Sequence, residues 1–224
     1  MSASDETAGI VPFEAIHTDL VPGRTVIVHI DAQNDFLSPD GHYAKSGVDI
    51  THMRRSIEPI TQLTAEARRR GVPVIWTRHG TRGVIDGGPF MRQRPFLRDG
   101  GLRQGTWGYE IYEPLGALAE DWYVEKTRLS AFFNTNLDSL LRSLNAETVI
   151  FTGVLTNQCV AASSKDAMFR DYFPIVVEEA TGTTLPHLHA PAIEMMKVGW
   201  AEVAPLDDTI AQLEKFPLSN TGPR

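Results

Sequence analysis

Residues 151–160 have the sequence FTGVLTNQCV and contain the only cysteine of the chain, Cys159. A β-branched run precedes this stretch, Gly153 interrupts it, and the residues after Cys159 have a helical pattern. Cys159 is therefore predicted to lie where a strand turns into a helix. A helix N-terminus carries a partial positive charge and unpaired N–H groups, which lower the pKa of a thiol and bind an oxyanion. We interpret Cys159 as a candidate nucleophile; the alternative, more common for a lone cysteine, is a small buried core residue.

The length and charge of the chain narrow the class of protein. Its 224 residues are 42% hydrophobic and carry a formal net charge of -7 without a basic run. We expect a single domain over residues 1–224, with residues 1–23 as an N-terminal arm. A small-molecule or protein partner is favoured over nucleic acid or a membrane surface, and we expect a small-molecule substrate. One cysteine excludes an internal disulfide, and the lack of a secretory or membrane-spanning pattern predicts a cytoplasmic protein.

Apolar runs alternate with helical patterns along most of the sequence. Strands are expected at residues 25–30, 72–77, 123–126, 148–152, 174–177 and 202–203, and helices at 50–70, 134–144, 160–169, 191–197 and 206–213. This alternation predicts an α/β fold with three layers, α/β/α, around a doubly wound, Rossmann-like parallel sheet. Residues 81–108 are rich in glycine and arginine and are expected to form a long irregular connection.

Three polar residues follow predicted strands: Asp31 follows the first, Lys126 the third and Cys159 the fourth. Each alone has an ordinary explanation, since Asp caps helices and Lys is usually a solvated surface charge. Together, at the carboxyl edge where ligands bind in open α/β sheets, they suit one reaction. Asp31 accepts the proton of the Cys159 thiol and returns it to a leaving amine, while Lys126 tunes both partners.

Three ordered motifs support this interpretation. They are VHIDAQNDF at residues 28–36, EK at 125–126, and GVLTNQCV at 153–160. With these motifs, the chain from residue 25 to 181 resembles the isochorismatase-like cysteine hydrolase superfamily. The resemblance implies a catalytic triad of Asp31, Lys126 and Cys159 and a covalent thioester-type intermediate. It also implies a cis peptide between Val154 and Leu155, with the N–H groups of Leu155 and Cys159 forming the oxyanion hole.

Two features of the sequence separate it from branches of this superfamily. Nicotinamidases carry a metal-binding Asp-x-His after the second strand, where this chain has Arg78-His79-Gly80. We therefore expect no metal and no other cofactor. Isochorismatases without a thiol lack the cysteine, so Cys159 favours hydrolysis of a C–N bond over that of a vinyl ether. Residues 105–109 and 126–135 are most similar to ureidoacrylate and N-carbamoylsarcosine amidohydrolases.

The expected substrate contacts come from the loops around this edge. His79 stands where ureidoacrylate enzymes carry Asn, and Leu129 where they carry Tyr, although His79 is equally well a plain loop histidine. Arg82, Arg92 and Arg94 suit a substrate carboxylate, or else a solvated loop. Aromatic residues at 36, 107, 132 and 133 suit a pocket wall, or core in the case of 132 and 133. The residues expected to bind substrate are Phe36, His79, Arg82, Arg92, Trp107, Leu129 and Asn157.

The predicted function is a cysteine-dependent amidohydrolase of a small carbamoyl, ureido or amide compound. The alternatives are a catalytically decayed scaffold protein of the same fold, or a related amidase on a biuret-like or nicotinamide-like amide. A dinucleotide-binding oxidoreductase is disfavoured because no Gly-x-Gly-x-x-Gly follows the first strand. The resemblance further implies a homo-oligomer, a dimer or tetramer.

Overall fold

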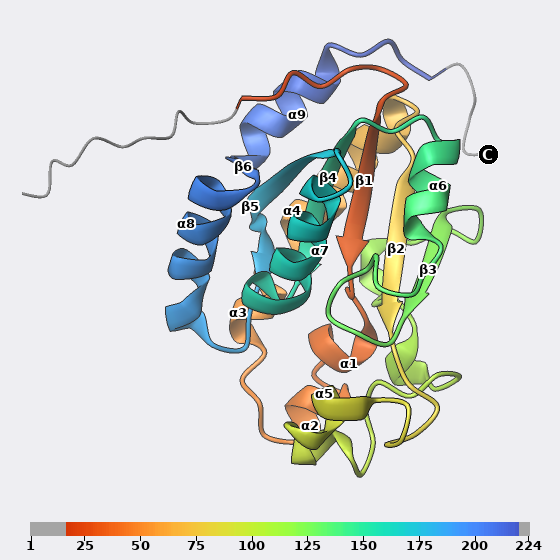
Figure 1. The fold of residues 1–224 in the computed structure, drawn as a ribbon, viewed down its shortest axis with the longest axis vertical. Helices are drawn as coiled ribbons and strands as arrows, with labels where there is room; N and C mark the ends of the chain where they lie inside the picture. The colour runs from red at the N-terminus through yellow and green to blue at the C-terminus, as the bar shows by residue number, and fades with distance from the viewer. Residues whose placement is uncertain (1–16, 220–224) are drawn as a thin grey trace, which may run out of the picture.

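Figure 1 shows the computed structural model of the protein, which describes residues 17–219. Its centre is a parallel six-stranded sheet in the order β3-β2-β1-β4-β5-β6. The strands are β1 (Thr25–Ile30), β2 (Val74–His79), β3 (Trp122–Lys126), β4 (Thr148–Val154), β5 (Phe173–Gly182) and β6 (Glu202–Ala204). The two central strands, β1 and β4, are buried along their whole length because helices cover both faces. The predicted three-layer α/β/α fold is confirmed.

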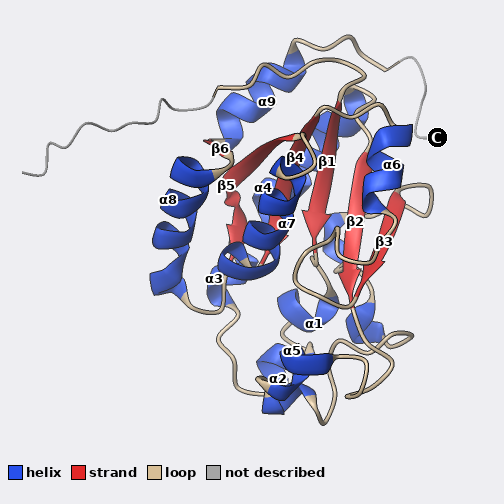
Figure 2. Cartoon of the chain, in the orientation of Figure 1, coloured by secondary structure: helices blue, strands red, loops and turns tan. Residues whose placement is uncertain are grey.

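Helices form a layer on each face of the sheet (Figure 2). One layer contains α3 (Thr51–Arg54), α4 (Ile57–Arg69) and α9 (Leu206–Glu214); the other contains α6 (Leu137–Ser143), α7 (Ala161–Met168) and α8 (His189–Gly199). Neighbouring residues of β1 pack into the cores on opposite faces of the sheet: Ile27 packs with the first helix layer and Val28 with the second. This alternation places every second side chain of a strand on the same face.

The remaining short helices lie beyond the carboxyl ends of the strands. They are α1 (Asn34–Leu37), α2 (His42–Lys45) and α5 (Gly88–Arg92), and Figure 1 shows them together below the arrowheads of β1 and β2. The predicted irregular connection at residues 81–108 therefore contains α5 and two short 3-10 turns, Pro95–Leu97 and Trp107–Tyr109. These segments surround the ends of β1 and β2, where Asp31 and His79 lie.

Several predicted boundaries differ from the structure. The helix expected at residues 50–70 is two helices, because Arg55 and Ser56 separate α3 from α4. The helix expected at 134–144 begins only at Leu137, after a turn in which Asn134 has a positive φ of 59°. Strand β5 continues five residues past the predicted end, to Gly182, with a register shift against β4. The register shift allows the polar residues after the predicted end to stay in the same strand. The apolar pattern alone did not indicate this continuation.

The described part of the predicted N-terminal arm packs against the domain. The N–H of Thr18 donates to the carboxylate of Glu202 on β6 at 2.6 Å, and that of Leu20 to the side chain of Gln212 on α9 at 3.1 Å. Residues 1–16 of that arm lie outside the described residues. Among the described helices, none combines the length and hydropathy of a bilayer-spanning segment.

Gly153 allows the two central strands to approach each other at the edge that carries Asp31. It pairs with Ile30 in the β1–β4 register and has a positive φ of 98°. A Cβ atom added to Gly153 would lie 2.0 Å from the carbonyl oxygen of Ile30. Only glycine fits this close contact and this backbone angle. The glycine that interrupts the strand pattern thus brings the segment of Cys159 next to that of Asp31.

Candidate active site

Asp31 is the first residue after β1, and its side chain is completely buried. Its backbone has a positive φ of 50°, a conformation that Asp tolerates better than most residues. The hydroxyl of Thr77 on β2 donates to Asp31 Oδ1 at 2.7 Å. Burial raises the pKa of the Asp31 carboxyl group, while Lys126 and Thr77 oppose that rise. A carboxylate with a raised pKa is a stronger proton acceptor at neutral pH.

Lys126 is the last residue of β3 and is also completely buried. Its Nζ lies 2.7 Å from Asp31 Oδ2 and donates to the backbone carbonyls of Arg128 at 2.9 Å and Leu129 at 3.0 Å. The three N–H donors of an ammonium group are thereby matched by three acceptors. Burial opposes the charge on Lys126, but the interactions with Asp31, and then with Cys159, outweigh burial and raise the pKa of the amine. Lys126 is therefore a fixed ammonium group.

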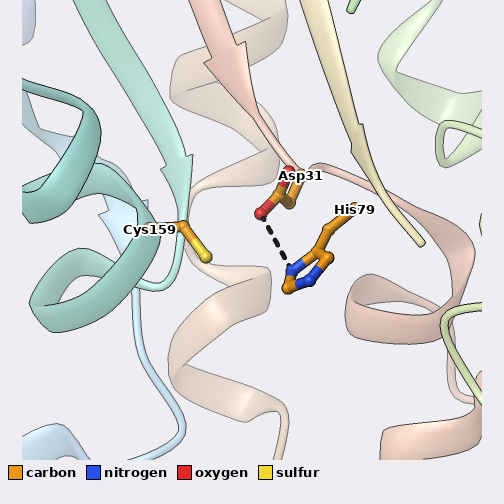
Figure 3. A group of neighbouring side chains, drawn as sticks. All are labelled: Asp31, His79 and Cys159. Carbon is orange, nitrogen blue, oxygen red and sulfur yellow. Dashed lines mark ion pairs between the residues drawn. The ribbon is translucent and has the colours of Figure 1, made fainter. Parts of the chain in front are cut away.

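Cys159 lies in a single π-helical turn, Thr156–Val160, between β4 and α7. Figure 3 shows its sulfur pointing toward Asp31 and His79, each at the end of its own strand. One donor atom from each of the three side chains lies within 4.8 Å of the others. Since Lys126 lies 2.7 Å from the same Asp31 carboxylate, the structure brings together Asp31, Lys126 and Cys159, the three residues that the sequence singled out. They meet because β1, β3 and β4 end at the same edge of the sheet.

The expected lowering of the thiol pKa is wrong. Burial raises the pKa of Cys159 to about 12, with Lys126 lowering it and Asp31 raising it further. The helix that was expected to stabilise a thiolate is preceded by the π-turn, and Cys159 lies within that turn rather than at the first residue of α7. The side chain is 3% exposed, so loss of hydration outweighs the attraction of the ammonium. At neutral pH Cys159 is a thiol beside a proton acceptor.

The backbone around Cys159 has the geometry that the resemblance implied. The peptide bond between Val154 and Leu155 is cis. The Leu155 carbonyl accepts hydrogen bonds from the N–H groups of Gln158 and Val160, but not from that of Cys159 between them. The proposed oxyanion hole, formed by the N–H groups of Leu155 and Cys159, stays a prediction.

His79 ends β2 and faces the same cluster. Its Nδ1 is 3.9 Å from Asp31 Oδ2, and both ring nitrogens are buried without a hydrogen-bond partner in the described chain. Burial, followed by the positive charges of Lys126, Arg94 and Arg128, holds its pKa well below the usual range. His79 is therefore a neutral imidazole buried beside Asp31 at the end of β2, and not a histidine of a loop. Its contact with a substrate stays a prediction.

Asp31, His79 and Cys159 also form a set of donors of the kind that binds transition metals. The ammonium group of Lys126 lies 2.7 Å from the same Asp31 carboxylate. A divalent cation bound by that carboxylate would be repelled by this buried positive charge. The residues therefore fit a metal poorly, and the absence of a metal requirement stays a prediction.

The other residues predicted to bind substrate are placed differently. Phe36 is buried, with its ring centroid 4.6 Å from that of Tyr43, and Leu129 contributes the carbonyl that accepts from Lys126. Asn157 is half-buried and accepts a hydrogen bond from the hydroxyl of Thr183 at 2.7 Å. Arg82, Arg92 and Trp107 are exposed. Phe132 is buried in the core, whereas Phe133 is exposed.

Three further residues position the site, and two of them, Thr77 and Gln33, were not singled out by the sequence pattern. Thr77 orients Asp31, as described above. The side chain of Gln33 accepts from the N–H of His79 at 2.8 Å and donates to the carbonyls of His79 and Tyr109. Arg94 donates to the side chain of Gln158, next to Cys159, at 2.8 Å. Gln33 lies within a quoted motif and Thr77 within a predicted strand, but only the tertiary structure reveals these contacts.

Comparison with known proteins identifies the family. Residues 25–208 match the family described as the isochorismatase domain. The chain belongs to the isochorismatase family. Among its curated relatives, the ureidoacrylate amidohydrolase RutB of Methylobacterium radiotolerans is 32% identical over 88% of this chain and 84% of the relative. RutB of Rhizobium rhizogenes is 37% identical over 72% of each chain.

Solved structures show the same fold. A cysteine hydrolase from Pseudomonas syringae pv. phaseolicola superposes with a TM-score of 0.82 at 25% identity, covering 90% of this chain and 98% of the other. N-carbamoylsarcosine amidase from Thermoplasma acidophilum gives a TM-score of 0.67 at 25% identity, covering 82% of this chain and 97% of the other. This isochorismatase-family chain thus resembles a cysteine hydrolase and an N-carbamoylsarcosine amidase in fold.

Proposed function

We propose that Asp31, Lys126 and Cys159 hydrolyse a C–N bond of a small carbamoyl, ureido or amide compound through a covalent thioester-type intermediate. The enzyme class follows from the family and its named relatives: the chain is an amidohydrolase. The observation that carries the mechanism is the buried cluster itself, with Lys126 Nζ 2.7 Å from Asp31 and the sulfur of Cys159 facing the same carboxylate.

The first half of the reaction uses Asp31 as a base and then as an acid. Cys159 Sγ attacks the carbonyl carbon while its proton moves to the Asp31 carboxylate, so the thiolate never accumulates. The N–H groups of Leu155 and Cys159 bind the negative oxygen of the tetrahedral intermediate. The C–N bond then breaks, the proton on Asp31 moves to the leaving nitrogen, and ammonia or an amine departs. Cys159 is left as a thioester.

The second half regenerates the thiol. Asp31, again a carboxylate, takes a proton from water, and the oxygen of that water adds to the thioester carbon. The C–S bond breaks and the sulfur recovers its proton from Asp31, releasing a carboxylic or carbamic acid. Lys126 keeps its charge throughout, because its three acceptors and the raised pKa of its amine hold the proton on Nζ.

Two assays test this proposal: ammonia release from a panel of ureas, carbamoyl compounds and primary amides, and loss of substrate for a vinyl ether. We expect turnover within the carbamoyl and ureido group and none of the vinyl ether. Cys159→Ala should abolish that turnover while preserving the circular dichroism spectrum. Turnover of the vinyl ether alone, or of no amide at all by a folded enzyme, would contradict the proposed reaction. The homo-oligomer expected from the resemblance stays a prediction, tested by light scattering.

A further inference from the structure

The two ring nitrogens of His79 have no role in the reaction described above. The imidazole is completely buried, and its Nδ1 lies 3.9 Å from Asp31 Oδ2. Within residues 17–219, five buried side-chain polar atoms lack a hydrogen-bond partner, and both ring nitrogens of His79 are among them. Asp31 Oδ2 is a third, although it forms the ion pair with Lys126. Unpartnered buried polar atoms are uncommon, and a ligand, an ordered water or a catalytic role explains most of them.

Other groups hold His79 in place, so its ring nitrogens are not needed for that purpose. The N–H of His79 donates to the side-chain oxygen of Gln33 at 2.8 Å, and the His79 carbonyl accepts from the Gln33 amide at 3.1 Å. The ring packs against that of Phe90, with 4.6 Å between the centroids. The residue is thus fixed by its backbone and by an apolar contact, and both nitrogens can serve a small molecule at the site.

His79 offers a hydrogen-bond acceptor and not a positive charge. Burial, followed by the charge of Lys126, holds its pKa well below the usual range, while the backbone of Thr127 opposes that lowering. One nitrogen of a neutral imidazole carries a proton and the other accepts. Figure 3 shows the ring and the Asp31 carboxylate facing the sulfur of Cys159, and one donor atom from each residue lies within 4.8 Å of the others. Two acceptors therefore lie beside the proposed nucleophile.

The separation of these two acceptors suits one water molecule. At 3.9 Å, His79 Nδ1 and Asp31 Oδ2 are too far apart for a direct hydrogen bond. An oxygen atom about 2.8 Å from each of them, an ordinary hydrogen-bond length, bridges this separation. A water in a buried site needs two or more polar partners, and these atoms supply them. A water in this position lies beside Cys159, where the carbonyl carbon of a thioester is bound.

We propose that His79 Nδ1 and the Asp31 carboxylate together hold the water that hydrolyses the thioester, which makes His79 a catalytic residue. This inference rests on the proposed function. One proton of the water moves to Asp31 as the water oxygen bonds to the thioester carbon. The second proton stays on that oxygen and is donated to His79 Nδ1. The C–S bond then breaks, and the sulfur of Cys159 takes the proton from Asp31. His79 is neutral before and after the step.

The first half of the reaction depends less on His79. The leaving nitrogen is placed by its covalent bond to the substrate, whereas the attacking water has no such bond and is oriented only by its hydrogen bonds. Removing the acceptor at His79 should therefore slow hydrolysis of the acyl-enzyme and leave its formation nearly unchanged. A residue that only supports the fold would affect both steps.

His79→Leu tests this assignment, because leucine has a similar volume and no polar side-chain atom. Rapid quenching and mass spectrometry give the rate constants for formation and hydrolysis of the Cys159 acyl-enzyme, with the best substrate of the panel above. We expect hydrolysis to slow by on the order of 10- to 100-fold and formation to change by less than about threefold. The acyl-enzyme should then accumulate, with a burst of ammonia. Hydrolysis at the wild-type rate, or equal slowing of both steps, would overturn the proposal.

Two further variants separate the acceptor from the packing of the ring. His79→Asn brings an amide oxygen near the position of Nδ1 and should recover much of the rate of hydrolysis. The matched control is Phe90→Leu, which removes the ring packed against His79 but no polar atom. It should leave the ratio of the two rate constants unchanged. A ratio that falls as far in Phe90→Leu as in His79→Leu would show that packing, and not the acceptor, sets the rate.

Hydroxylamine gives a second measurement, because it is a stronger nucleophile than water and attacks a thioester without a base. Its addition should restore most of the turnover of His79→Leu and raise that of the wild type far less. No restoration would contradict a defect in the attack of water.

The acyl-enzyme also separates this inference from the proposed function. Turnover without an acyl-enzyme and without a hydroxylamine product would refute the covalent reaction itself. An acyl-enzyme whose hydrolysis does not depend on His79 would refute only the water site. If no compound of the panel is turned over, acetylation of Cys159 by p-nitrophenyl acetate supplies the acyl-enzyme, and hydrolysis that slows in His79→Leu would leave the water site standing while the proposed substrate class fails.

Discussion

Lys126 Nζ lies 2.7 Å from Asp31 Oδ2 in a site where both side chains are completely buried. Each partner therefore compensates the charge of the other in surroundings that exclude water. Removing one charge leaves the other buried without compensation, which costs far more than a surface ion pair contributes. The Lys126–Asp31 ion pair therefore stabilises the charged form of Asp31, the proposed base, and contributes to the stability of this edge of the sheet.

Lys126→Met should destabilise the protein by roughly 3–5 kcal/mol, because it leaves the Asp31 carboxylate buried and unpaired. Adding Asp31→Asn to that variant should recover much of the loss. Denaturant unfolding measures both, and activity should be lost in the single and the double variant. A double variant as unstable as Lys126→Met would mean that the pair does not act through charge compensation.

The raised pKa of Asp31 sets the expected acid limb of activity. The carboxylate accepts the thiol proton, so activity needs Asp31 deprotonated and should fall as the pH drops through its pKa. Because that pKa is raised, the fall should occur at a higher pH than for an ordinary aspartate. A pH profile of kcat/KM measures it with a substrate that does not titrate in this range. An acid limb at or below the ordinary aspartate range would contradict this role.

The raised pKa of Cys159 predicts slow reaction with neutral alkylating agents. With a thiol pKa of about 12, the rate of modification by iodoacetamide should still be rising at pH 10. Mass spectrometry of the single cysteine gives this rate, and a small free thiol serves as the reference. A plateau near neutral pH would show that the enzyme holds a thiolate, as the sequence pattern first suggested.

Gly153→Ala should separate the two central strands. Its Cβ would lie 2.0 Å from the Ile30 carbonyl oxygen, and its φ of 98° is unfavourable for alanine. We expect a loss of roughly 3 kcal/mol or more in the free energy of unfolding. Gly23→Ala is the control, because Gly23 has a positive φ of 74° but no atom near the added Cβ. That variant should lose only about 1–2 kcal/mol, and equal losses would remove the role of the close contact.

Activity should not depend on a bound metal. The Lys126 ammonium already compensates the Asp31 carboxylate that a cation would need. Extended dialysis against a chelator should leave kcat/KM unchanged, with metal content measured on the same sample. Loss of activity that a divalent cation restores would contradict this expectation.

The sequence was sufficient to predict the sheet and the cluster at its edge. Apolar runs end at Asp31 and Lys126, and parallel strands place their carboxyl ends together, so the convergence of these residues with Cys159 followed from topology. The neutral His79 and the buried Thr77 depend on side-chain contacts across strands, which periodicity does not contain. The predicted element boundaries were wrong where the conformation is set locally, as at the break formed by Arg55 and Ser56 and at the register shift of β5.

The sequence alone could not give the direction of the pKa shift of Cys159, nor could it show which arginine lies beside the site. The helix position of Cys159 suggested a lowered thiol pKa, but complete burial reverses the direction, and burial is a property of the packed site. Similarly, Arg82, Arg92 and Arg94 are equivalent in sequence, and only the structure distinguishes Arg94 by its bond to Gln158. Predicting the chemistry of the site therefore requires both the spacing of the residues in the sequence and their packing in the structure.

The most direct test of the central claim, that Cys159 is the nucleophile, is the turnover of the preferred substrate by Cys159→Ala. The substitution removes the sulfur and leaves Asp31, Lys126 and the oxyanion N–H groups in place. We expect kcat/KM to fall by about 10⁴-fold or more while the protein stays folded and still binds the substrate. Turnover within tenfold of the wild type would contradict the covalent mechanism and with it the account of this site.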